Sequence, residues 1–187
     1  MTAASQQVTA VVHGLTKAGL TVGTAESLTG GLVCAALTSV PGASAVVRGG
    51  VVAYASEVKA DVLAVDRALL EREGAVNAAV ARDLAEGVRR VLRCDVGLAT
   101  TGVAGPDPAD GAPVGTVYVA ASGPWGILVE RHVLTGDRAD IRSATVQAAL
   151  QLLEEGLQNL RDEVGSEGYG GRHEGRSAHH DDREEAP

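Results

Sequence analysis

Aromatic side chains are scarce in this 187-residue sequence, which has no Phe, one Trp and three Tyr. Proteins that bind single-stranded nucleic acids commonly stack the bases on aromatic side chains. The formal net charge of −8 would also repel a phosphate backbone. We therefore expect no nucleic-acid partner, and a core filled by Val, Leu, Ala and Gly.

Metal ligands and long apolar runs are scarce as well. Before residue 166 the sequence has two His, His13 and His132, and its two Cys, Cys34 and Cys94, lie far apart. This spacing resembles no zinc motif, so we expect no metal and two buried, reduced thiols. No apolar run approaches the roughly 20 residues of a membrane span. We expect a cytoplasmic protein with no membrane partner.

The hydrophobic residues, 45% of the chain, suffice for one globular domain. Residues 166–187 hold six acidic residues and three Arg, but no Val, Leu or Ile. Such a segment buries too little apolar surface to offset the entropy lost on ordering. The sequence predicts a folded domain over 1–165 and a disordered, acidic, His-containing tail over 166–187.

Helical and strand patterns alternate along the predicted domain. We predict strands at 20–25, 49–55 and 95–102, and two more joined by a hairpin turn at 123–126. Ser5, Ser56, Asn77 and Asp137 stand where helices are expected to begin. This order predicts an α/β fold, a layered α/β/α domain with a mixed sheet.

Small polar residues follow the first predicted strand, in the stretch TAESLTGG at 24–31. A hydroxyl here would lie near the start of a helix, where backbone N–H groups can hold an anion or an oxyanion. The stretch matches none of the usual dinucleotide, phosphate-loop or nucleophile-elbow motifs. A second interpretation stays open, in which Ser27 or Thr29 caps the helix and the glycines form a tight turn.

Two more polar stretches follow the next predicted strands. Tyr54 and Lys59 flank the second strand end, and Lys59 is one of only two lysines in the chain. A buried lysine can act as a base, which arginine cannot, although an exposed lysine at a helix start is the plainer interpretation. The third stretch, residues 100–106, carries hydroxyls and glycines that suit either a ligand wall or a turn.

Several motifs together resemble one family, the CinA C-terminal domain family, which includes stand-alone nicotinamide mononucleotide deamidases. They occur in the family's order over about residues 5–160: TAESLTGG, TSVPGAS, GGVVAYASEVKADVLAV, GAVNAAVARDLAEGV, TTGVAGPDPADGAPVGTVYVA and LTGDRADIR. Several motifs in one order are more specific than any single motif.

The resemblance implies roles for individual residues. Ser27 matches the family's serine nucleophile, and Tyr54 and Lys59 match its proton-transfer pair. Thr101 and Gly102 match a motif lining the substrate site, and Arg138 matches a residue that contacts the nucleotide phosphate. Thr29, Gly30 and Gly31 complete the expected substrate-binding set, with backbone amides of Gly30, Gly31 or Gly102 as oxyanion donors.

Two positions depart from the pattern that the family usually has. Ser56 stands where Asn is common, and Ala112 stands where Lys is frequent. Neither departure touches Ser27, Tyr54 or Lys59.

The resemblance implies a cofactor-free amidohydrolase acting on a small mononucleotide substrate. Two alternatives stay open: a non-catalytic nucleotide-binding module linked to competence or the DNA-damage response, and an amidase for a different pyridine or nucleotide amide. The sequence does not decide between a monomer and a homodimer.

Overall fold

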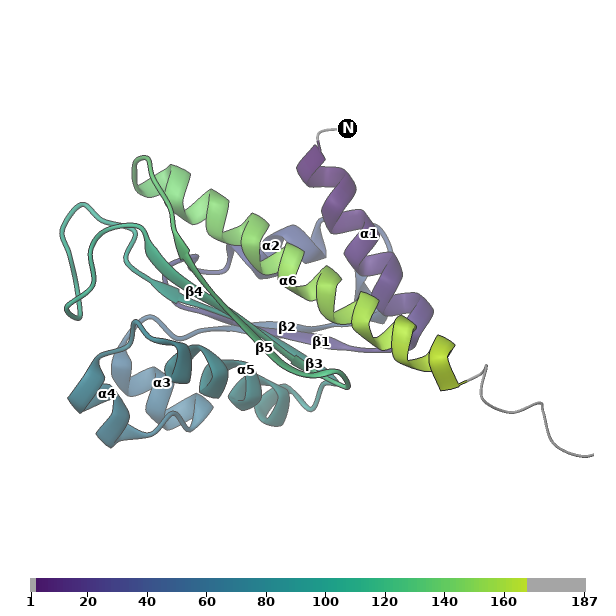
Figure 1. Cartoon of the computed structure of the whole chain (residues 1–187), viewed down its shortest axis with the longest axis horizontal. Coiled ribbons are helices and arrows are strands. Elements are labelled where there is room, and N and C mark those ends of the chain that lie inside the picture. Colours follow the sequence, from purple (N-terminus) through teal and green to yellow (C-terminus); the bar gives the residue numbers. More distant parts are fainter. Residues whose placement is uncertain (1–2, 168–187) are drawn as a thin grey trace, which may run out of the picture.

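A five-stranded mixed sheet forms the middle layer of the protein (Figure 1). The computed structural model describes residues 3–167. The strands are β1 (Val22–Glu26), β2 (Val47–Val52), β3 (Val96–Gly102), β4 (Thr116–Gly123) and β5 (Gly126–Val133). The helices are α1 (Ala3–Ala18), α2 (Leu32–Thr38), α3 (Ser56–Leu63), α4 (Arg67–Glu73), α5 (Ala78–Leu92) and α6 (Arg138–Glu167), with a short 3-10 helix, η1 (Ala43–Ala45).

The sheet order, β2-β1-β3-β4-β5, brings three strand ends to one edge. Strand β1 pairs in parallel with both β2 and β3, whereas β4 and β5 continue the sheet antiparallel to β3. The last residue of β1, Glu26, lies opposite Val52 of β2 and Thr100 of β3. The loops that follow β1, β2 and β3 therefore meet, in the position where open α/β sheets bind ligands.

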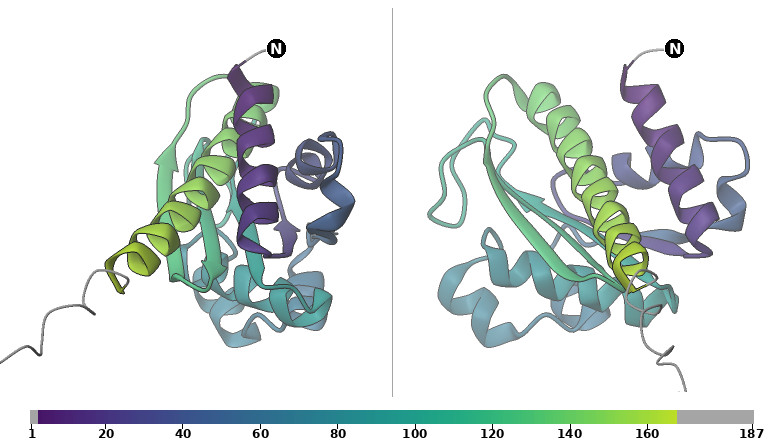
Figure 2. Two further views of the ribbon diagram at one scale, coloured as in Figure 1. Left: turned by 90° about the vertical axis from the view of Figure 1, so that its right-hand side faces the viewer. Right: turned by 45° about the vertical axis from the view of Figure 1, so that its right-hand side comes forward.

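Helices cover both faces of the sheet (Figures 1 and 2). Helices α1, α2 and α6 lie on one face, over a core dominated by Val and Leu. Helices α3, α4 and α5 lie on the other face, over a second core rich in Ala. Successive strand residues alternate between these cores, as Leu98 and Ala99 do in β3. The predicted α/β/α fold with a mixed sheet is confirmed.

Glycine sets how closely α5 approaches the sheet. A Cβ on Gly97 of β3 would collide with the carbonyl oxygen of Ala85 in α5. A Cβ on Gly87, on the same helix, would collide with the carbonyl oxygen of Leu63 at the end of α3. These contacts between backbones let a core with few aromatic side chains pack densely.

Several predicted boundaries differ from those in the structure. Strand β2 ends at Val52, so Tyr54 lies in the following loop rather than in the strand. Ser56 is the first residue of α3 and makes no capping bond, because Ala55 holds the cap position. Asn77 and Asp137 do cap α5 and α6, as predicted.

Helix α6 continues to Glu167, past residue 165, and the limits of the domain and of the tail stay a prediction. The rest of the predicted tail lies outside the described residues. Helix α4, which the sequence pattern did not single out, is capped by the Asp66 side chain. Both cysteines are free, but Cys34 is only half-buried, unlike the prediction, whereas Cys94 is buried.

Candidate functional site

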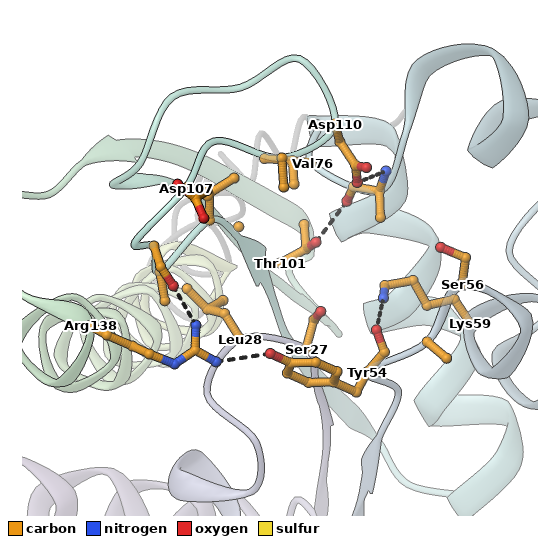
Figure 3. A pocket seen from close by; sticks show the side chains of 17 residues that line it. Ser27, Leu28, Tyr54, Ser56, Lys59, Val76, Thr101, Asp107, Asp110 and Arg138 are labelled. Carbon is orange, nitrogen blue, oxygen red and sulfur yellow. Dashed lines mark hydrogen bonds between the residues drawn. The ribbon is translucent and has the colours of Figure 1, made fainter.

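A cavity of about 370 Å³ lies where the loops after β1, β2 and β3 meet (Figure 3). Six of the predicted site residues line it: Ser27, Tyr54, Lys59, Thr101, Gly102 and Arg138. They come from five places in the chain: the loops after β1 and β2, the end of β3, and the starts of α3 and α6. Segments far apart in sequence thus converge on one space.

Ser27 stands directly after β1, at the base of this cavity. Its backbone N–H donates to the carbonyl oxygen of Thr100 at 3.0 Å, which ties the turn to the neighbouring strand. The residue is 9% exposed, and within residues 3–167 its hydroxyl has no hydrogen-bond partner. The hydroxyl is therefore free to meet a ligand in the cavity.

The carboxylate of Glu26 caps α2, which corrects the interpretation that Ser27 or Thr29 does so. Its two oxygens accept the backbone N–H groups of Gly31, Val33 and Cys34 at 2.8–3.0 Å. The Glu26 side chain also accepts the Thr24 hydroxyl at 3.1 Å. The N-terminal donors of α2 are thus used inside the protein rather than offered to an anion.

Three of the predicted substrate-binding residues do not line the cavity. Thr29 is fully buried, and its hydroxyl shares a 2.8 Å hydrogen bond with that of Thr100. The Gly30 N–H donates to the carbonyl oxygen of Ser27, and the Gly31 N–H donates to Glu26. These residues shape the turn that carries Ser27, so the expected oxyanion donors at Gly30 and Gly31 are already engaged.

Lys59 is a buried cation, with 2% of its surface exposed. Its Nζ donates to the carbonyl oxygen of Tyr54 at 3.0 Å, and this is its only hydrogen bond among the described residues. Burial lowers the pKa of Lys59 from its ordinary value, although the negative charges of Asp110 and Glu57 partly oppose this. A lysine held in this way reaches its neutral form at a lower pH than usual.

Tyr54 and Arg138 form the open rim of the cavity. The Tyr54 side chain is exposed, and its hydroxyl accepts a hydrogen bond from Nη2 of Arg138 at 2.9 Å. Arg138 also donates from Nη1 to the carbonyl oxygen of Gly105 at 2.7 Å (Figure 3). The guanidinium at the start of α6 thus joins the loops that follow β2 and β3.

The end of β3 and the loop that follows it form the opposite wall. The Thr101 hydroxyl donates to the carbonyl oxygen of Ala75 at 2.7 Å, so its proton is already used in a hydrogen bond inside the protein. Gly102 lies so close to β4 that a Cβ would be 2.6 Å from the carbonyl oxygen of Thr116. Of the two positions that depart from the family pattern, Ser56 lines the cavity and Ala112 does not.

Two acidic residues of this wall, Asp107 and Asp110, were missed by the sequence reasoning. Asp110 accepts the backbone N–H of Ala75 at 2.8 Å, which joins the loop after β3 to the segment before α5. Gly74 makes this approach possible, because a Cβ there would lie 2.6 Å from the Asp110 Cβ. The run of Asp, Pro and Gly in the sequence indicated a loop but not this contact.

The described part of the chain holds no group of three or more His, Cys, Asp or Glu residues that could bind a metal. None of its helices is both long and apolar enough to cross a membrane.

Comparison with known proteins identifies the family. The sequence profile described as CinA C-terminal domain matches residues 4–157. The chain belongs to the CinA C-terminal domain family. It is 48% identical over 158 residues to a CinA-like protein of Frankia casuarinae, an alignment that covers 84% of this chain and 36% of that protein. The chain thus spans about a third of the length of the curated CinA relatives it matches.

Solved structures of the CinA superfamily have the same fold. A Klebsiella pneumoniae protein of the superfamily has a TM-score of 0.80 at 32% identity, covering 84% of this chain and 99% of that one. The competence/damage inducible protein CihA of Agrobacterium tumefaciens has a TM-score of 0.79 at 36% identity, covering 82% and 94%. The likeness to CinA proteins therefore extends to the fold that assembles the cavity.

Proposed function

We propose that this chain is an amidohydrolase that converts nicotinamide mononucleotide to nicotinic acid mononucleotide and ammonia. The observation that carries the proposal is a buried lysine of lowered pKa in the same cavity as a free serine hydroxyl. A serine hydroxyl is a weak nucleophile until a nearby base removes its proton, and a Ser–Lys pair is one established solution. Family members that act as mononucleotide deamidases make this substrate the leading choice.

The reaction would begin with Ser27 and Lys59. Neutral Lys59 takes the hydroxyl proton of Ser27, whose oxygen then attacks the carboxamide carbon. The tetrahedral intermediate expels ammonia after the nitrogen is protonated, which leaves an acyl-enzyme. Water hydrolyses the acyl-enzyme and restores the Ser27 hydroxyl.

Tyr54 and the substrate complete this scheme. No hydrogen bond joins Ser27 to Lys59 or Tyr54 within residues 3–167, so the proton crosses cavity space that substrate or water occupies. The exposed Tyr54 hydroxyl assists proton transfer on the leaving-group side. No metal or organic cofactor has a role in this scheme.

Arg138 is the proposed contact for the nucleotide phosphate. Its planar guanidinium group lies at the cavity rim, and two of its N–H groups can donate to two oxygens of one phosphate. Tyr54 is the sole aromatic residue in the cavity lining, so little surface is available for stacking a pyridine ring. Recognition would depend mainly on backbone groups, hydroxyls and charge.

One assay tests this function and its alternatives. Purified protein is incubated with nicotinamide mononucleotide, nicotinamide and NAD, and released ammonia is measured for each. We expect release from the mononucleotide alone. Release from another amide would mean an amidase of different specificity. If calorimetry shows that the mononucleotide binds but no ammonia is released, the result would favour a nucleotide-binding regulatory module linked to competence or DNA damage.

Replacing the nucleophile gives the first prediction. Ser27→Ala should lower kcat for ammonia release by at least about 10³-fold, because no acyl-enzyme can form. Calorimetry should show that the mononucleotide still binds, since Arg138 is unchanged. Near-normal turnover by this variant would rule out Ser27 as the nucleophile.

A further inference from the structure

We propose that Glu26 and Arg142 are positioning residues that hold the Ser27 turn so that the backbone N–H group of Leu28 binds the oxyanion. The inference rests on the proposed function only in taking Ser27 as a nucleophile. Neither residue lines the cavity, so each would act through the turn that it holds.

Glu26 holds the turn from the side of its N–H groups. It is 1% exposed, and its carboxylate accepts the amides of Gly31, Val33 and Cys34 together with the Thr24 hydroxyl. Hydrogen bonds to a charged group are roughly twice as strong as neutral ones. A carboxylate with four such partners fixes the position of the residue that directly precedes Ser27.

Arg142 holds the same turn from the side of its carbonyl groups. Its Nε donates to the carbonyl oxygen of Leu28 at 3.0 Å, and its Nη2 donates to that of Thr29 at 2.8 Å. Within residues 3–167 the guanidinium makes no ion pair or other hydrogen bond. It lies one helical turn after Arg138, so α6 supplies one arginine to the cavity and one to the turn.

The backbone donor of Leu28 is unused in the protein. Among the described residues, the N–H group of Leu28 makes no hydrogen bond, whereas those of Ser27, Gly30 and Gly31 do. Leu28 is 4% exposed and lines the cavity, and buried N–H groups are nearly always paired. A free donor directly after a nucleophile fits the charge that develops on the attacked carbonyl oxygen.

The test measures how fast Ser27 reacts with a fluorophosphonate. In this reaction the Ser27 Oγ–P bond forms as the P–F bond breaks, fluoride leaves with the bonding electrons, and Lys59 takes the hydroxyl proton. Labelling is followed by intact mass and located by peptide mass spectrometry. The probe needs the nucleophile and the oxyanion donor but not the nucleotide substrate, so it is independent of which amide the enzyme hydrolyses.

Arg142→Lys is compared with Arg161→Lys, the same change at an exposed position of the same helix. A lysine ammonium lacks the rigid, planar set of N–H groups with which arginine donates to two successive carbonyl oxygens. We expect Arg142→Lys to slow labelling and to lower kcat for the mononucleotide by about ten-fold or more, with KM little changed. Arg161→Lys should match the wild type, and circular dichroism should show both variants folded.

Two more variants separate positioning from general damage to the fold. Glu26→Gln keeps the side-chain volume but turns an acceptor into a donor facing backbone N–H groups, so labelling should fall by about 10²-fold. In Arg142→Ala, added methylguanidinium should restore part of the labelling rate without changing the melting temperature.

The outcomes distinguish this inference from the proposed function. Wild-type labelling rates in Arg142→Lys and Glu26→Gln would overturn the inference, as would a wild-type protein that does not label at Ser27. Labelling that depends on Arg142, in a protein that releases no ammonia from the mononucleotide, would support the inference and reject the proposed substrate.

Discussion

Lys59 has the most unusual surroundings of any ionisable residue on the cavity wall. Its ammonium is buried, and a backbone carbonyl oxygen rather than a carboxylate accepts its hydrogen bond. Without a carboxylate in contact, burial dominates and lowers the pKa of Lys59. The same burial that suits the lysine to the proposed role of base makes it costly for stability.

This cost leads to a prediction about stability and pH. Below the lowered pKa the folded protein carries a buried cation, and the free energy of unfolding rises with pH between that pKa and the ordinary value of 10.5. Lys59→Met should therefore raise the melting temperature at neutral pH, and the gain should shrink as the pH rises through this window. The measurement is thermal unfolding at a series of pH values.

Lys17→Met provides the control, because Lys17 is exposed at the end of α1. This change should have little effect at any pH. Lys59→Met should also be inactive toward the mononucleotide, so a loss of activity would accompany a gain in stability. A Lys59→Met variant that is less stable than the wild type at neutral pH would contradict the argument.

At the scale of elements, the contact between α5 and β3 supports the cavity wall. Thr101 and Gly102 end β3, and the other end of the wall, Ala75 and Val76, leads into α5. Gly97 permits the close approach of these two elements. A side chain at this position would push against backbone, which cannot move aside as a flexible side chain can.

Gly97→Ala should therefore lower the free energy of unfolding by about 1–3 kcal/mol, the usual cost of overpacking a core. Gly14→Ala in α1 is the control, since its Cβ would meet only the flexible ends of Leu157 and Arg161. Alanine also favours helices over glycine, so this change should be close to neutral. Urea unfolding of both variants measures the difference, and equal effects would rule out the proposed role of Gly97.

The sequence was sufficient to predict much of the arrangement of elements, because periodicity and turn residues act locally. The alternation of strands and helices, the hairpin at 123–126, and the caps at Asn77 and Asp137 all follow from nearby residues. Helix α4 was missed because its seven residues are too short for a clear period. Family motifs, rather than spacing, brought Ser27, Tyr54 and Lys59 together.

The contacts of charged residues could not be predicted in this way. Glu26 looked like a polar residue beside Ser27, and only the fold shows that its carboxylate caps α2. Arg142 reaches residues more than a hundred positions earlier in the chain. Such long-range pairs depend on how elements pack, and a hydrophobic pattern carries no information about them.

At the scale of the whole molecule, a series of hydrogen bonds crosses the cavity rim. Lys59 bonds to the main chain of Tyr54, the Tyr54 hydroxyl to Arg138, and Arg138 to Gly105. These residues belong to α3, the loop after β2, the start of α6 and the loop after β3. The proposed base and the proposed phosphate contact are thus linked through a single tyrosine.

The bond between Arg138 and Tyr54 has a kinetic consequence. A phosphate that binds the Arg138 donors would release the Tyr54 hydroxyl for proton transfer. The free energy of phosphate binding would then speed the reaction at the carboxamide carbon, although the two groups lie apart in the substrate. Nicotinamide riboside, which lacks the phosphate, should then show a lower kcat as well as a higher KM. If its kcat equals that of the mononucleotide, the phosphate acts as an anchor alone; if it falls, the substrate itself completes the catalytic arrangement on arrival.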